Sequence, residues 1–236
     1  MAGTLTGANI LSRVEDILQD TGNVRWSEAE LLRYLNDGQR AVVNVRPEAA
    51  ADHSNVQLVT GTEQTIPDVA LRLIKVVRNM SAAGGSATGK RVIRLVNRDI
   101  LDTQEPDWHD PTVTGGAVHG TTVKHYVFDE DDPRKYYVYP GVSGNAYVEI
   151  VTARNPTDLA NTSATLYIDD IYANPIVDFV LYRAFLKDAE FAGNAERSGM
   201  HYQLFTASLG VGGQAQFTLS PNQDGVQQPI STASTG

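Results

Sequence analysis

The sequence predicts an α+β fold: a discontinuous helical bundle, built from N- and C-terminal helices, that carries an inserted antiparallel β-sheet or sandwich domain. Apolar residues recur at intervals of three and four over about the first 50 residues and again from Asp170, which is typical of amphipathic helices. Between these segments, apolar residues alternate in short runs separated by turn residues, which is typical of strands. No helical pattern between the runs is long enough to connect parallel strands, so antiparallel pairing is favoured.

Two helices are expected before residue 50. The first ends at Thr21-Gly22-Asn23. The second follows Ser27, because Ser27 and Glu30 match a capping box, in which two side chains satisfy two backbone N–H groups. It ends before Pro47, since proline disfavours helical geometry at the preceding residue. We expect the two helices to pack as an antiparallel pair. The apolar face of the first consists of Ile10, Leu11, Val14, Ile17 and Leu18.

Short strands are expected in the middle of the chain. The segment between Phe128 and Tyr136 predicts a polar hairpin loop in which Pro133 fixes a backbone angle, and Gly84–Gly89 predicts a second, flexible loop. The chain has 10 tyrosines, and strand alternation is expected to expose some of them on an outer face suited to a subunit interface. The expected strands cover residues 56–59, 71–77, 92–96, 123–128, 136–139 and 147–151.

The helical pattern that begins at Asp170 is apolar on more than half of its circumference, which predicts a helix at the centre of the bundle. Pro175, near its start, is compatible with the first turn. A last helix is expected from Ala195 to Leu209, closed by Gly210. The residues after it are rich in Gly, Gln, Ser and Thr and carry almost no charge, so we expect an extended arm that orders on a partner.

The expected organisation therefore has four parts. Residues 1–53 form the first part of the bundle, 54–156 the inserted β-domain, 157–210 the second part of the bundle, and 211–236 the C-terminal arm. Phe217, Leu219 and Ile230 are the expected anchors of the arm on a neighbouring subunit or another protein.

Composition excludes several classes of function. The 28 acidic residues outnumber the 19 basic ones, which gives a net charge of −9 and argues against a protein that grips DNA. The absence of Cys excludes disulfides, thiolate zinc sites and thiol nucleophiles. No apolar stretch approaches the ~20 residues of a membrane span, and the N-terminus lacks the features of a signal peptide. We therefore expect a soluble, acidic, non-secreted protein without a membrane partner.

One segment resembles a nucleotide-binding motif. Gly84 and Gly89-Lys90 have the spacing of a phosphate-binding loop, in which glycine N–H groups and a lysine contact phosphates. Arg91, however, stands where Ser or Thr would bind Mg²⁺, and the residues after it alternate as in a strand. We interpret the segment as a β-loop.

The acidic run Asp129-Glu130-Asp131-Asp132 could in principle hold Ca²⁺ through its carboxylates. It lacks the glycine and the distal glutamate of an EF-hand loop, so a solvated hairpin tip is the favoured interpretation. The mutual repulsion of its charges makes the tip a candidate docking point for a basic partner surface.

The histidines do not have the spacing of zinc motifs, and no Ser or Cys lies in the context of a nucleophile. Trp108-His109-Asp110 is the most suggestive group, since an aspartate can orient an imidazole. We interpret Trp108 as an exposed interface residue of a loop. No catalytic, cofactor-binding or metal-binding residue and no cofactor is predicted, and the chain is not expected to be an enzyme.

Three segments, in this order and spacing, resemble the head-to-tail adaptor (connector) proteins of tailed bacteriophages, in particular the tail tubular protein A-like adaptors of short-tailed phages. The segments are Trp26–Asp37, Phe128–Pro140 and Ile171–Glu190, and the resemblance spans about residues 8–210. It implies a virion protein of the neck, assembled in the host cytoplasm. The arm matches no motif of these adaptors.

The resemblance also implies partners. It implies a homo-oligomeric ring of about twelve copies beneath the portal protein, joining the portal to a tail nozzle or tube protein. Genomic DNA would pass through this ring without specific binding, and the net charge of −9 fits a channel that does not hold phosphates. Within the bundle, we expect Arg183 to pair with an acidic residue, since an unpaired buried charge is costly.

Two other interpretations stay open at this point. A carbohydrate-binding or fibre-like β-module of a tail would need a β-domain that exposes an aromatic platform. A metal-assisted hydrolase would need a bound metal ion. Neither explains why helical segments flank the strands on both sides in the sequence.

Overall fold

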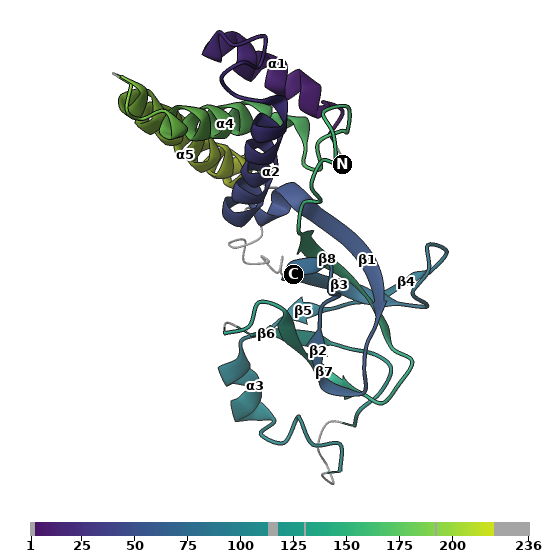
Figure 1. Cartoon of the computed structure of the whole chain (residues 1–236). Coiled ribbons are helices and arrows are strands. Elements are labelled where there is room, and N and C mark those ends of the chain that lie inside the picture. The colour runs from purple at the N-terminus through teal and green to yellow at the C-terminus, as the bar shows by residue number, and fades with distance from the viewer. Residues whose placement is uncertain (1–2, 113–117, 130, 192, 220–236) are drawn as a thin grey trace, which may run out of the picture. The chain divides into compact units, whose positions relative to one another are not determined.

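The computed structural model describes residues 3–112, 118–129, 131–191 and 193–219, with side chains up to residue 210 (Figure 1). The chain divides into two compact units. Residues up to Arg46 and from Leu159 onward form the helical unit, and Pro47–Asp158 form the strand unit. Helices therefore flank a strand region from both sides in the sequence, and the predicted α+β class is confirmed.

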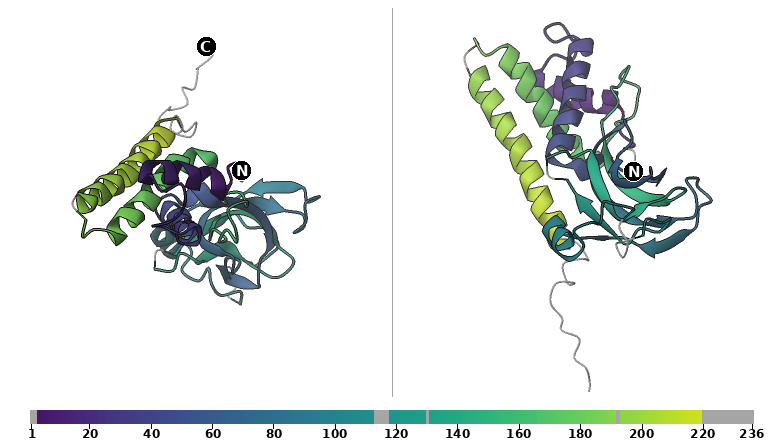
Figure 2. Two further views of the ribbon diagram at one scale, coloured as in Figure 1. Left: turned by 45° about the horizontal axis from the view of Figure 1, so that its top comes forward. Right: turned by 90° about the horizontal axis from the view of Figure 1, so that it is seen from below.

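The helical unit begins with α1 (Gly7–Leu18) and α2 (Glu28–Val45). Thr6 caps α1 in a capping box, and the Ser27 hydroxyl accepts a hydrogen bond from the Glu30 N–H at the start of α2 (3.3 Å). The other half of the box predicted at α2 does not form, because the Glu30 carboxylate accepts from the Tyr34 hydroxyl (2.8 Å) and the Lys187 ammonium (2.7 Å). Figures 1 and 2 show α1 running across α2, so the expected antiparallel pair is wrong.

The central helix of this unit is α4 (Ala173–Lys187), which follows the short 3-10 helix η2 (Asp170–Tyr172). It packs against α1, α2 and α5 (Asn194–Leu219). Pro175 lies in its first turn, as predicted. Each fully buried Ile, Val or Leu stabilises the fold by about 1.5–3 kcal/mol. The fully buried side chains of α4 include Ile176, Val180, Leu181 and Ala184.

The expectation that Gly210 closes the last helix is wrong, because α5 continues to Leu219 beside and beyond α4 (Figure 2). A glycine in a helix interior costs about 1 kcal/mol relative to alanine, which weakens a helix without ending it. Gly210 does not take the left-handed conformation that closes helices. Residues 211–219, expected in an extended arm, are therefore helical, and 220–236 lie outside the described residues.

Two buried polar side chains of α2 hold the segment that returns to the helical unit. The Asn36 amide accepts from the Leu159 N–H (2.9 Å) and donates to the Leu159 carbonyl (3.3 Å). The Gln39 side chain accepts from the Tyr167 N–H (2.8 Å). These bonds join the two chain segments of the unit, and they satisfy backbone groups that burial would otherwise leave unpaired.

The strand unit contains two four-stranded sheets. The neighbouring strands pair antiparallel, except for the parallel pair β5–β6. The first sheet has the order β1 (Ala51–Gln57), β8 (Tyr147–Arg154), β3 (Ala70–Met80), β4 (Gly89–Val92). The second has the order β2 (Gly61–Thr65), β7 (Lys135–Val142), β6 (His125–Phe128), β5 (Arg94–Leu95). A 3-10 helix, η1 (Pro47–Ala50), precedes β1.

The two sheets share one hydrophobic core, as a sandwich requires. The first sheet contributes Leu73, Val76, Val148 and Ile150, and the second contributes Tyr126, Tyr136, Val138 and Val142. A separate small core of Leu101, Trp108 and Val127 lies under α3 (Arg98–Gln104).

The strand unit differs from the prediction in four places, one of which is β1, expected over residues 56–59 and observed from Ala51 to Gln57. Strand β2 and helix α3 were not expected, and the strand expected over residues 92–96 is split between β4 and β5. Strand β2 is polar along its whole length, so it has no alternating apolar pattern. Its buried Gln64 bonds instead to the backbone of Val59, donating to the carbonyl and accepting from the N–H (both 2.8 Å).

Candidate interaction surfaces

The acidic run lies in the loop between β6 and β7, as the sequence predicts. The Asp129 carboxylate accepts a hydrogen bond from the Asp131 N–H (3.1 Å), and the Asp132 carboxylate accepts from the Arg134 N–H (2.9 Å). These bonds shape the turn without neutralising it, because no described cation forms an ion pair with these three aspartates. Glu130 lies outside the described residues.

The two cations that follow the acidic run are paired with residues elsewhere. The Arg134 guanidinium lies 3.1 Å from the Asp68 carboxylate, and the Lys135 ammonium lies 3.1 Å from the Glu63 carboxylate. The pKa of Lys135 is raised by its hydrogen bond to Glu63. The loop therefore keeps its negative charge although basic residues follow it directly in the sequence.

A polar groove of about 500 Å³ lies between this loop and the start of α3. Asp99 lines it on the α3 side, and Asp129 and Asp131 line it on the loop side. Arg98 also lines the groove, but its charge is engaged by Asp102 (3.4 Å) and by the ring of Tyr137 (5.2 Å to the ring centre). We call Asp99, Asp129 and Asp131 the acidic patch. Among the described residues, no three His, Asp or Glu side chains gather as a metal site would require.

A basic patch, which no motif of the sequence predicts, lies at the other end of β5 and β6. Arg91, Arg94 and Lys124 are exposed and, with His125, line a cavity of about 300 Å³. None of the three cations pairs with an acid in the described part of the chain. Burial lowers the pKa of His125, and Arg91, Lys124 and Arg94 lower it further. The sequence places Lys90, Arg91 and Arg94 within five residues, but Lys124 joins them only through the pairing of β5 with β6.

The loop that resembles a phosphate-binding motif is a hairpin between β3 and β4. The Ser81 N–H donates to the Thr88 carbonyl (3.0 Å), and the Ala87 N–H donates to the Gly84 carbonyl (3.0 Å). A strand, β4, follows Gly89 where a nucleotide-binding loop would open a helix. The interpretation of this segment as a β-loop is confirmed.

Trp108 is not the exposed interface residue that the sequence suggested. Its side chain is 1% exposed, and its indole N–H donates to the Asp102 carboxylate (2.8 Å). The prediction for Trp108 was wrong because α3 was not expected. Without this helix, no element was available to bury the Trp108 side chain.

The Trp108-His109-Asp110 group does not form an acid–base pair. The His109 Nδ1 lies 2.7 Å from the Thr62 hydroxyl, while the Asp110 carboxylate accepts from the Thr112 N–H (2.8 Å) and hydroxyl (2.7 Å). Burial lowers the pKa of His109, and Arg98 adds to this effect. Each of the two side chains stabilises a loop by itself.

A second His–Asp contact, between His201 of α5 and Asp178 of α4 (2.9 Å), lies in the packing between these helices. Ser198, one turn earlier on α5, donates its hydroxyl to the Tyr182 carbonyl (3.1 Å) and makes no bond to His201. The three residues therefore tie α5 to α4 and are not arranged as a nucleophile with its base.

The tyrosines of β7 are less exposed than strand alternation suggested. Tyr136 is buried in the shared core, and Tyr137 and Tyr139 are half-buried against Trp108, with ring centres 6.1 and 6.5 Å away. No aromatic side chain is exposed as a platform on the described part of the strand unit. The feature that would favour a carbohydrate-binding module is therefore missing there.

Arg183 does not form the predicted ion pair with an acidic residue of the bundle. Its guanidinium lies over the ring of Tyr34, 5.4 Å from the ring centre. Burial and the hydrogen bond to Glu30 raise the pKa of Tyr34 to about 12. Arg183 is half-buried, so the aromatic ring and solvent together make a salt bridge unnecessary.

The expected anchors of the arm lie at and beyond the end of α5 in the sequence. Phe217 and Leu219 belong to the last turns of α5, and Ile230 lies outside the described residues. Before them, Arg46 holds α5 by donating to the Leu209 carbonyl from Nε (3.0 Å) and Nη2 (2.5 Å). The outer face of α5 exposes Met200 and Leu204, each about half accessible to solvent. This helix therefore presents apolar surface as it approaches the C-terminal region.

A family model described as the SU10 adaptor protein matches residues 5–227. The chain belongs to the SU10 adaptor family. The match includes both the helical unit and the strand unit, and it confirms the resemblance to phage head-to-tail adaptors. No curated protein matches this sequence.

Membership of the SU10 adaptor family makes the chain a structural adaptor protein of phage virions that contacts other head and tail components. Families of this kind are usually non-enzymatic. No helix in the described part of this adaptor combines the length and the apolar character needed to cross a bilayer.

Proposed function

We propose that this adaptor forms a homo-oligomeric ring between the portal protein and the tail nozzle or tube, and that genomic DNA passes through the ring. The observation that carries the proposal is the adaptor family match over residues 5–227, which includes both units. Twelve copies would match the ring that the adaptor resemblance implies.

The division of the chain into a helical unit and a strand unit supports a role in connecting two partners. Each unit has its own hydrophobic core and its own surface features, so one can bind a partner without involving the other. The helical unit carries α5, whose apolar outer face leads to the C-terminal region. The strand unit carries the acidic and basic patches.

For the C-terminal region we propose attachment to a neighbouring subunit or to the portal. Phe217, Leu219 and Ile230 are the largest apolar residues available for this contact in a segment rich in Gly, Gln, Ser and Thr. Because α5 extends to Leu219, two truncations separate two contributions. A chain ending at Leu219 removes the residues after the helix, and a chain ending at Gly210 removes its last turns as well.

Both truncated chains should fold, because they keep the buried α5 side chains that the structure describes, Ser198, His201, Phe205 and Leu209. We expect the chain of residues 1–210 to lose attachment to purified portal rings, measured by sedimentation and negative-stain micrographs. A truncated chain that still attaches as well as the full chain would reject this role for the C-terminal region.

Passage of DNA is compatible with the charge of the chain. Every phosphate that a protein neutralises adds salt-dependent affinity, which would slow a moving genome. A chain with a net charge of −9 supplies enough acidic residues for a lumen with little affinity for DNA. In an assembled ring we expect the lumen to be lined by Asp, Glu and neutral residues, and a lumen lined by Lys and Arg would contradict this.

A further inference from the structure

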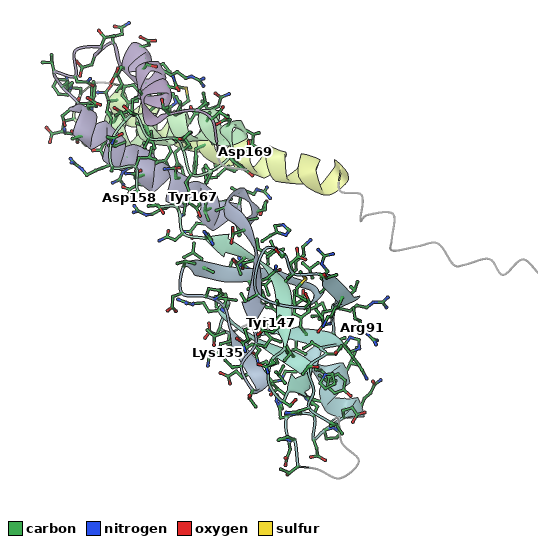
Figure 3. All side chains as sticks on the ribbon, turned by 90° about the vertical axis from the view of Figure 1, so that its right-hand side faces the viewer. Arg91, Lys135, Tyr147, Asp158, Tyr167 and Asp169 are labelled. Carbon is green, nitrogen blue, oxygen red and sulfur yellow. The ribbon has the colours of Figure 1, made fainter. Side chains whose placement is uncertain are left out.

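The basic and acidic patches lie at opposite ends of the same pair of strands. β5 and β6 run parallel, with Arg94 opposite His125. The basic patch gathers where the two strands begin, and the acidic patch gathers beyond their ends. The four residues of β6 separate the patches by about 13 Å at ~3.3 Å per residue. In Figure 3, Arg91 of the basic patch and Lys135, which follows the acidic loop, lie on opposite sides of the strand unit.

Neither patch is neutralised within the described part of the chain. Other cations of the strand unit do have acidic partners: Arg78 contacts Glu149 (2.7 Å) and Arg154 contacts Asp52 (2.9 Å). By contrast, the three cations of the basic patch and the three carboxylates of the acidic patch form no ion pair among the described residues. Complementary charge is therefore left available at the two ends of one strand pair.

The two patches also differ in form. The basic patch surrounds a cavity of about 300 Å³, whereas the acidic patch lines a groove of about 500 Å³, with Asp129 and Asp131 coming from the loop between β6 and β7. Val92, which lines the basic cavity, and Leu95, which follows Arg94 and lines the acidic groove, are each more than half exposed. β5 is the edge strand of its sheet, so a loop that enters this cavity would also cover apolar surface and a free strand edge.

We propose that the acidic patch of one copy docks into the basic patch of the next copy. This proposal rests on the proposed function, because it specifies the contact between copies of the ring. The contact is heterologous: each copy uses its basic patch toward one neighbour and its acidic patch toward the other, and such contacts generate closed rings when the rotation closes. A second copy fits the basic patch better than DNA, because the matching acidic group is present on the same chain and a net charge of −9 repels phosphates.

Two charge reversals test the contact. One variant, Arg91→Glu with Arg94→Glu, inverts the basic patch, and the other, Asp129→Lys with Asp131→Lys, inverts the acidic patch. Arg72→Glu with Lys75→Glu is the matched control, since these two exposed cations lie on β3 outside both patches. Self-association is measured by sedimentation velocity over a range of concentrations, alone and in the presence of purified portal rings.

Each inverted variant should associate with itself roughly 100-fold more weakly than the wild type, because like charges then face each other, and the control should associate normally. An equimolar mixture of the two inverted variants should regain assembly. In an alternating arrangement every acidic patch again meets a basic one, so misfolding cannot explain the recovery.

The remaining outcomes overturn the proposal in distinguishable ways. If the wild type assembles and both inverted variants assemble equally well, this contact is wrong while the proposed function stands. If Arg91→Glu with Arg94→Glu leaves assembly intact but abolishes binding to a 30-base-pair duplex, the basic patch serves nucleic acid instead. A wild-type chain that stays monomeric, even with portal rings present, contradicts both the contact and the proposed function.

Discussion

Replacing Asn36 should destabilise the helical unit, because its buried amide holds the backbone of Leu159. Asn36 is 7% exposed and makes two hydrogen bonds with the backbone of Leu159, at 2.9 and 3.3 Å. Asn36→Leu keeps the branching of the side chain but leaves a buried N–H and a buried carbonyl without partners, at about 1–3 kcal/mol each. Because the second bond is long, we expect a total loss of about 3 kcal/mol.

The two tryptophans allow this loss to be assigned to one unit. Trp26 is buried in the helical unit and Trp108 in the strand unit. In a Trp108→Phe background, fluorescence during a urea titration therefore reports the helical unit alone. The midpoint should fall by about 1.5 M if the denaturant slope is about 2 kcal/mol/M.

Asn44→Leu provides the control, because Asn44 is exposed on the same helix. It should change the free energy of unfolding by less than about 0.5 kcal/mol. If Asn36→Leu and Asn44→Leu unfold at the same urea concentration, the argument that Asn36 holds the returning segment is refuted.

Three further predictions concern acid, alkali and the small core. Hydrogen bonds from the Trp26, Val24 and Arg25 N–H groups lower the pKa of Asp20. Its contribution to the free energy of unfolding is therefore present above the unfolded-state pKa of about 3.9 and is lost as the pH falls through the lower folded-state pKa. Asp20→Asn should flatten the acid limb of a stability–pH curve followed by circular dichroism, and an unchanged limb would count against it. The pKa of Tyr34 is raised to about 12, so its contribution to the free energy of unfolding is present below pH ~10 and is lost as the pH rises toward 12. Tyr34→Phe should therefore remove the loss of stability between these two pH values. Trp108→Ala should destabilise the strand unit by about 3–5 kcal/mol and accelerate amide exchange in β6 and β7, whereas protection equal to that of the wild type would show that this core is unimportant.

The sequence was sufficient for the elements whose burial has a simple period. α2 follows Ser27 and ends before Arg46-Pro47, and α4 is apolar around most of its circumference because it packs against three helices. The acidic hairpin between β6 and β7 was also predictable, since turn residues and charges mark it directly.

The elements that were missed depend on contacts distant in sequence. β2 is polar, and Gln64 is buried only because the backbone of Val59 satisfies its amide. α3 buries only Leu101 and relies on Trp108 and Val127, which come from other segments. α5 passes through Gly210, and its contact with Arg46, which donates to the Leu209 carbonyl, also comes from a residue distant in the sequence.

The two charged patches also differ in how far local sequence predicts them. The acidic patch was partly visible, because Asp129 and Asp131 stand in one run of the sequence. The basic patch was visible only in part, since Arg91 and Arg94 are close in the sequence but Lys124 comes from a later segment, directly before β6. Parallel pairing of β5 with β6, which no local pattern predicts, places them together.

The most direct test of the central claim is electron microscopy of the full chain mixed with purified portal rings. The account predicts a closed ring of this adaptor seated coaxially on the portal, with an open channel wide enough for duplex DNA. A mixture in which the chain remains an unassembled monomer beside intact portal rings would contradict the assignment of this chain as a head-to-tail connector.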